Sequence, residues 1–107
     1  MWSTVEWHFA SRLDLKRIRR GSEDPGKFDA AAREVNQLLM YAATRKGAPQ
    51  PIGRLTSRTI EIIGNRAGVI PEIIRVMRCG PIEVLFTVDS PGVDSPGRVH
   101  VWMIQPG

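Results

Sequence analysis

Five cations near the start of the chain could bind a phosphate backbone. They are Arg12, Lys16, Arg17, Arg19 and Arg20. Several Lys and Arg side chains on one element release condensed counterions together when they meet a nucleic acid, which gives such a group affinity for DNA or RNA. The same run is typical of a solvated helix face, and it could equally dock an acidic protein segment. The sequence leaves these three uses open.

His8 and His100 are the two histidines, and both are candidates for proton transfer because imidazole titrates near neutral pH. Both lie in stretches of strand-like alternation at positions off the apolar face, so we expect each to be partly exposed. A surface histidine without a role is the more common case. Cys79 is the only cysteine, and no neighbouring His or Asp could activate it, so we expect a small buried thiol.

Other side chains are assigned structural roles. Glu83 is expected to pair across strands with Arg75 or Arg78 rather than act as a catalytic carboxylate. Trp7 is predicted to lie in the core. Trp102 fits either a buried position or a base-stacking one, since both faces of its strand are apolar.

We expect neither a metal nor a cofactor. A single cysteine excludes an internal disulfide and a multi-cysteine zinc site. No Gly-rich phosphate loop, dinucleotide-binding fingerprint or zinc-ligand spacing occurs in the sequence.

Length and charge define the class of protein. With 107 residues, of which 42% are hydrophobic, the chain is expected to form one domain over residues 1–107. No run of apolar residues is long enough for a membrane span and the first residues do not resemble a secretion signal, so a cytoplasmic location without membrane contact is expected. A net charge of +4 and a pI near 10.0 favour a polyanionic partner, either nucleic acid or acidic protein.

Periodicity, caps and turns predict an α+β fold in the order β-α-α-β-β-β, with two helices packed on a small, mainly antiparallel sheet. The expected elements are a strand over 4–9, a basic helix over 12–20 opened by a Ser11–Asp14 capping box, a turn over 22–26, a helix over 29–45, a linker over 47–53, strands over 72–79 and 82–88 joined by a tight Gly80-Pro81 hairpin, turns over 89–92 and 94–97, and a last strand over 99–104. Residues 56–63 suit either a helix or a strand and stay unassigned.

The second helix is predicted to lie across one face of the sheet. The apolar residues expected to meet there are Val5, Trp7, Phe9, Ile82, Val84, Phe86 and Val88 from the strands, and Val35, Leu38 and Leu39 from the helix. The other face is expected to be partly exposed, carrying Glu83, Thr87 and one of Arg75 and Arg78.

This order of elements is similar to that of the RelE/ParE toxin superfamily. Residues 78–89, Arg-Cys-Gly-Pro-Ile-Glu-Val-Leu-Phe-Thr-Val-Asp, resemble the family's strand pair, and residues 5–10 and 14–18 resemble its first strand and helix. Members of the family are ribosome-dependent mRNA endonucleases or inhibitors of DNA gyrase, and a cognate antitoxin neutralises them by wrapping the domain. The resemblance therefore implies the toxin component of a type II toxin–antitoxin pair, whose partners are an antitoxin and either the ribosome with mRNA or gyrase.

Arg78 matches the family's basic position before the hairpin turn, while Glu83 stands where an Arg is usual and Phe86 where a Tyr is usual. If the chain is an mRNA endoribonuclease, the candidate catalytic residues are Arg78, Arg75 and His100. The alternative is a non-catalytic basic module of the same fold, which holds nucleic acid or a protein through Arg12, Lys16, Arg17, Arg19 and Arg20.

Overall fold

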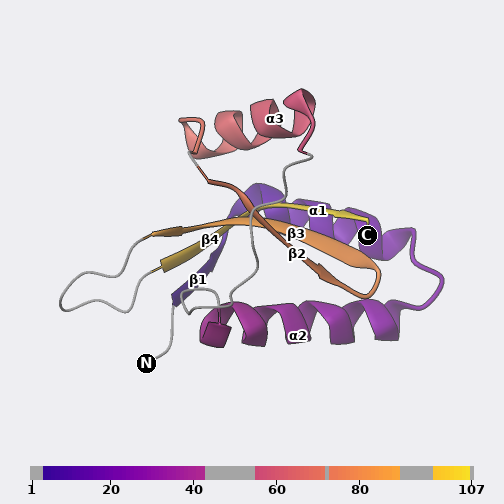
Figure 1. The fold of residues 1–107 in the computed structure, drawn as a ribbon. Coiled ribbons are helices and arrows are strands. Elements are labelled where there is room, and N and C mark those ends of the chain that lie inside the picture. Colours follow the sequence, from indigo (N-terminus) through magenta and orange to yellow (C-terminus); the bar gives the residue numbers. More distant parts are fainter. Residues whose placement is uncertain (1–3, 43–54, 72, 90–97, 107) are drawn as a thin grey trace.

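The structure is a computed structural model that describes residues 4–42, 55–71, 73–89 and 98–106 (Figure 1). These residues form an α+β domain of three helices and one four-stranded sheet. In chain order the elements are β1 (Thr4–Trp7), α1 (Phe9–Arg20), α2 (Pro25–Ala42), α3 (Ser57–Ala67), β2 (Arg75–Cys79), β3 (Ile82–Asp89) and β4 (Arg98–Pro106). The expected α+β class is confirmed, and α3 is added to the expected order.

The sheet has the strand order β1-β4-β3-β2. The last three strands form the expected antiparallel meander, while β1 pairs with β4 in parallel. The predicted hairpin at Gly80-Pro81 is confirmed: Gly80 has a φ of +55°, a conformation that glycine adopts without steric cost.

One face of the sheet packs on α2, as predicted (Figure 1). Val35 and Leu39 of α2 are fully buried against Val84 and Phe86 of β3. Two of the residues expected there lie elsewhere. Phe9 is 75% exposed because β1 stops at Trp7 and Phe9 begins α1, and Leu38 is 40% exposed.

The other face of the sheet is only partly covered, as expected: of the residues predicted there, Glu83 is buried, Thr87 is half-buried and the Arg78 side chain is 74% exposed. Helix α3 lies over it (Figure 1), and Ile63 from this helix is buried together with Ile74, Val76 and Leu85. Residues 56–63, which fit either period in the sequence, thus belong mainly to a helix. Thr56 caps that helix by accepting a hydrogen bond from the Thr59 N–H at 3.1 Å.

The beginnings of α1 and α2 also differ from expectation. Helix α1 starts at Phe9 with His8 as its N-cap residue, so the predicted capping box at Ser11 and Asp14 is wrong, and both residues are buried inside the helix. Helix α2 starts at Pro25, within the predicted turn, because a proline suits the first helical turn. The expected end of α2 after residue 42, the linker over 47–53 and the turn residues 90–97 lie outside the described part of the chain.

Candidate functional site

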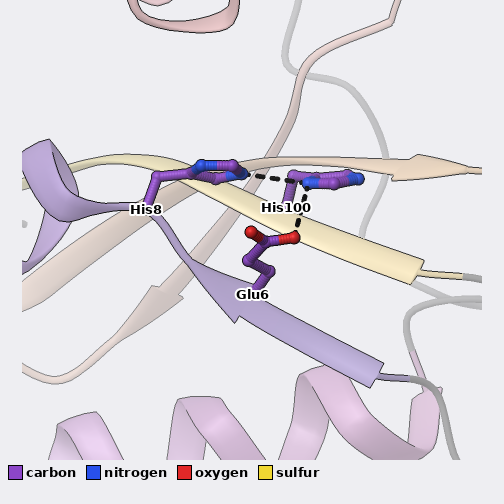
Figure 2. A group of neighbouring side chains, drawn as sticks. All are labelled: Glu6, His8 and His100. Carbon is purple, nitrogen blue, oxygen red and sulfur yellow. Dashed lines mark hydrogen bonds and ion pairs between the residues drawn. The ribbon is translucent and has the colours of Figure 1, made fainter.

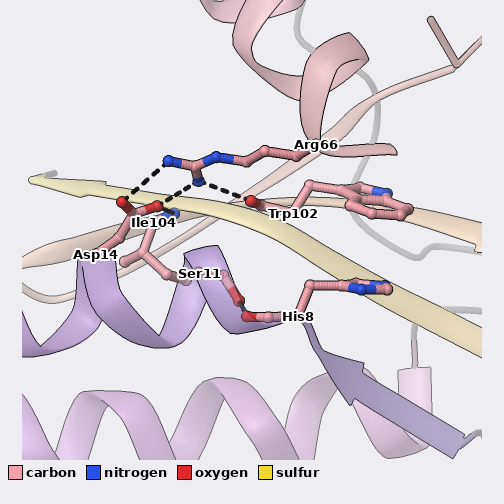
Figure 3. Close-up of polar contacts among 6 residues, drawn as sticks. All are labelled: His8, Ser11, Asp14, Arg66, Trp102 and Ile104. Carbon is pink, nitrogen blue, oxygen red and sulfur yellow. Dashed lines mark hydrogen bonds and ion pairs between the residues drawn. The ribbon is translucent and has the colours of Figure 1, made fainter. Parts of the chain in front are cut away.

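Strand β4 is longer than its neighbour β1, and several polar side chains gather along the side of β4 that β1 leaves uncovered. Strand β1 pairs with residues 98–101 only, so the following backbone groups of β4 need other partners on that side. Arg66 of α3 donates to the Trp102 carbonyl at 2.9 Å, and the Ile104 N–H donates to the Asp14 carboxylate at 3.1 Å (Figure 3). Side chains from α1 and α3 thus continue the hydrogen bonding where β1 ends.

Asp14 and Arg66 also bind each other. The guanidinium donates to both carboxylate oxygens, at 2.7 and 3.2 Å, and the Asp14 side chain is only 8% exposed. Ser11 lies one turn earlier on the same face of α1 and donates to the His8 carbonyl at 2.6 Å. These polar groups are fully satisfied and link α1, α3 and β4, so we assign them a structural role.

A second polar group, made of Glu6, His8 and His100, lies at the start of this edge (Figure 2). Register explains the grouping: Glu6 of β1 is directly opposite His100 of β4, and His8 follows Glu6 by two residues and so points to the same face. His8 Nε2 is 2.9 Å from His100 Nδ1, and the His100 Nδ1 atom is 3.6 Å from Glu6 Oε2. The rings meet edge to edge, with planes 25° apart.

Neighbouring side chains fix both rings. His100 Nε2 is 2.9 Å from Asp89 Oδ2, so this nitrogen carries a proton and donates it to the carboxylate. With its proton on Nε2, the His100 ring can offer the lone pair of Nδ1 to His8. Trp102 stacks on His8 with centroids 4.0 Å apart, and the indole N–H is itself held by the Thr87 hydroxyl at 2.8 Å.

Burial lowers the pKa of His8 below its ordinary 6.5, an effect that Glu6 opposes and His100 reinforces. His8 is therefore neutral at pH 7. The facing nitrogens of the two imidazoles can share a proton or can together hold a cation.

A pocket of about 430 Å³ opens beside this cluster. His100, Trp102 and Asp89 line one side, and apolar side chains from the segment after α3, including Val69 and Ile73, line the other. Both apolar residues are more than half exposed. Of the three cluster residues, His100 is the one that lines this pocket.

The five cations predicted to bind a partner all lie on the solvent face of α1. Arg12, Lys16, Arg17, Arg19 and Arg20 are exposed, while Ser11, Asp14, Leu15 and Ile18 turn inward. Arg19 forms an ion pair with Asp29 at 2.9 Å. Within the described residues, no ion pair involves the other four cations.

The structure does not bring the predicted catalytic residues together. Arg78 lies opposite Glu83, whose neighbour on β4 is Gln105, whereas His100 is five residues away along β4, about 16 Å at the rise of a strand. Arg75 lies nearer the His100 end. Strand alternation nevertheless places it with Met77 on the α2 side, while His100 lies on the α3 side.

Arg78 and Glu83 form the expected cross-strand pair. Arg78 Nε donates to Glu83 Oε2 at 2.7 Å, and Gln105 donates to the other carboxylate oxygen at 2.6 Å. Burial alone would raise the pKa of Glu83, but these hydrogen bonds outweigh it and hold the pKa below 4.5. Cys79 is half-buried and donates to Glu34 at 3.4 Å, which agrees with an inert thiol.

Sequence reasoning missed Glu6 and Asp89 as neighbours of His100, and Asp14 and Arg66 as a buried pair. Only the alternation of Glu6 with His8 was visible, because the other partners come from distant strands and helices.

None of the helices in the described residues is long and apolar enough to cross a membrane. Comparison of the chain with family models, with curated proteins and with solved structures gave no match.

Proposed function

We propose that the protein is a RelE/ParE-like toxin component of a toxin–antitoxin pair that acts on translation and binds RNA through the exposed face of α1. The observation that carries the binding step is the charge of that face. Helix α1 contains five cations and one acid, and the acid, Asp14, is buried and already paired with Arg66. The outward charge is therefore not neutralised by the helix itself.

The geometry of α1 suits a polyanion. The cations span Arg12 to Arg20, which at a rise of 1.5 Å per residue makes a cationic face about 12 Å long, enough to contact more than one phosphate. Arg12, Lys16 and Arg20 follow one another at four-residue spacing and so lie along one line of the helix. The ion pair with Asp29 reduces the contribution of Arg19 to RNA binding. We assign binding mainly to the other four cations.

An antitoxin would compete for the same surface. A groove of about 440 Å³ lies between α1 and α2, with Trp7 and Leu15 among its apolar residues and Arg12 and Arg33 among its cations. An amphipathic segment with acidic residues matches this combination of apolar floor and basic rim. Antitoxin and RNA binding are thus expected to exclude each other.

The test is binding of a fluorescein-labelled single-stranded RNA, measured by anisotropy between 50 and 200 mM salt, salt concentrations at which phosphate contacts differ strongly. Arg17→Glu on α1 is compared with Arg58→Glu on α3, because both positions are exposed and each change lowers the net charge by the same amount. Arg17→Glu should weaken binding and reduce the salt slope by about one. Equal losses in both variants, or binding insensitive to salt, would contradict a site on α1.

The second candidate is a non-catalytic module of the same fold that only binds nucleic acid or protein. The arrangement that favours it is the Arg78–Glu83 pair, because an Arg already bound by a buried carboxylate is a poor partner for a phosphorane. Growth and ribosome-dependent mRNA cleavage distinguish the two. Growth arrest and cleavage that Arg78→Ala abolishes, while the variant stays folded, would support the endoribonuclease. Normal growth with RNA binding intact would support the module.

A further inference from the structure

We propose that Glu6, His8 and His100 form a binding site for one divalent transition-metal ion, of which zinc best suits the donors, and that the ion joins β1 to β4. This inference does not depend on the proposed function. Two imidazole nitrogens and one carboxylate oxygen are a donor set that zinc accepts in proteins, with a fourth position left for water.

The donor atoms are already close enough. The facing nitrogens of His8 and His100 are 2.9 Å apart, the Glu6 oxygen is 3.6 Å from the His100 nitrogen, and the three donors all lie within 4.8 Å of one another. A tetrahedral zinc ion with bonds of about 2.0–2.1 Å requires donors roughly 3.3 Å apart. Small rotations about the side-chain bonds of His8 and Glu6 therefore complete the site. The Glu6 side chain is 47% exposed and has room to turn.

The surroundings of His100 are those of a metal ligand. Its Nε2–H donates to Asp89, which leaves the Nδ1 lone pair directed at His8 and Glu6 (Figure 2). Metal-binding histidines in proteins regularly donate their other ring N–H to a carboxylate in this way, because the bond fixes the tautomer and makes the ligand more basic. Trp102 holds the His8 ring in place from one side. Neither ring has to be ordered by the ion.

Charge also favours a cation. Glu6 and Asp89 contribute two carboxylates beside two imidazoles, and Arg98 is the one cation that pairs with this group within the described residues, at 3.9 Å from Glu6. When the ion binds, the one N–H proton of the neutral His8 ring leaves Nε2 for solvent and Nδ1 of the same ring takes up a proton, so the ring stays neutral and its Nε2 lone pair is free for the ion. Arg98 is displaced from Glu6, which is easy because its side chain is 58% exposed.

The experiment uses the full chain, without an affinity tag and stripped with a chelator, and titrates it with zinc chloride in a calorimeter. We expect one ion per chain and a higher melting temperature with zinc. His8→Gln and His100→Gln should each weaken binding at least tenfold, and Asp89→Asn by about 10- to 100-fold. Cys79→Ser is the matched control, since Cys79 lies outside the cluster, and should leave the affinity unchanged.

A second measurement is independent of folding defects in the variants. The chain has only two histidines, so the imidazole ¹⁵N resonances of the wild-type protein can be followed individually during the titration. Shifts of His100 Nδ1 and His8 Nε2 on addition of zinc would support the site. The proposal is overturned if neither nitrogen shifts up to about 1 mM zinc, or if both histidine variants bind zinc as the wild type does.

Discussion

Loss of the Arg66 side chain is expected to be among the most destabilising single changes in this protein. Arg66→Met removes the bidentate partner of Asp14, whose side chain is only 8% exposed, and leaves an uncompensated buried carboxylate. The Trp102 carbonyl loses its donor at the same time. Breaking a buried ion pair in this way costs about 3–5 kcal/mol.

The exposure of Arg66 places the expected loss near the lower end, at about 3 kcal/mol, because water can partly solvate the carboxylate once the guanidinium is gone. At about 2.1 cal/mol/K per residue, a chain of 107 residues has an unfolding entropy near 0.22 kcal/mol/K. The melting temperature should therefore fall by about 13 °C. Urea denaturation followed by circular dichroism measures the loss of free energy, and a thermal scan measures the temperature shift.

The double variant tests the cause. Adding Asp14→Asn to Arg66→Met removes the buried charge while keeping an acceptor for the Ile104 N–H, so the double variant should be more stable than Arg66→Met alone. If the two changes simply add, or if Arg66→Met costs less than about 1 kcal/mol, then Arg66 and Asp14 do not stabilise the fold as a buried pair.

Two further outcomes concern Glu83 and Cys79. Because the pKa of Glu83 is lowered in the native state, its contribution to stability is complete above about pH 4.5 and is lost as pH falls through the lower native value. Arg78→Ala should lower the free energy of unfolding by about 1 kcal/mol at neutral pH. It should also move the midpoint of acid unfolding, measured by circular dichroism, to higher pH. An unchanged midpoint would show that Gln105 alone holds the carboxylate. Burial and, to a smaller extent, the Glu34 carboxylate raise the pKa of the Cys79 thiol above 9.0. Iodoacetamide should therefore alkylate Cys79 slowly at pH 8, and faster in the Glu34→Gln variant, with the rates followed by mass spectrometry. Fast alkylation of the wild type would contradict this.

The strands and hairpin were predictable because their signals are local. Gly80-Pro81 between two β-rich runs defines the turn, and the spacing of Val35 and Leu39 defines the buried face of α2. Helix α3 could not be assigned from the sequence because Ile60 and Ile63 fit both a helical and a strand period. The side chain that caps it, Thr56, was visible in the sequence and could have decided the matter.

The candidate site could be predicted only in part. Ser11 and Asp14 look like an exposed cap because short polar residues usually are exposed, and the partner that makes Asp14 buriable, Arg66, lies in a helix that the sequence left open. His100 was a candidate, but its neighbour Glu6 follows from the parallel register of the first and last strands. Tertiary packing decides this register, so the periodicity of the sequence cannot predict it.

The pairing of β1 with β4 has a consequence for the order of folding. Thr4 aligns with Arg98, so nearly the whole chain separates the two partners, while β2, β3 and β4 pair with their neighbours in sequence. Contacts between distant residues close the longest loops and form late, so β1 is expected to dock after the meander has assembled on α2. As a four-residue edge strand it should also be the first to detach, which would leave residues 98–101 of β4 open to pairing with another molecule. The junction of these two strands thus sets both the last step of folding and the first route to aggregation.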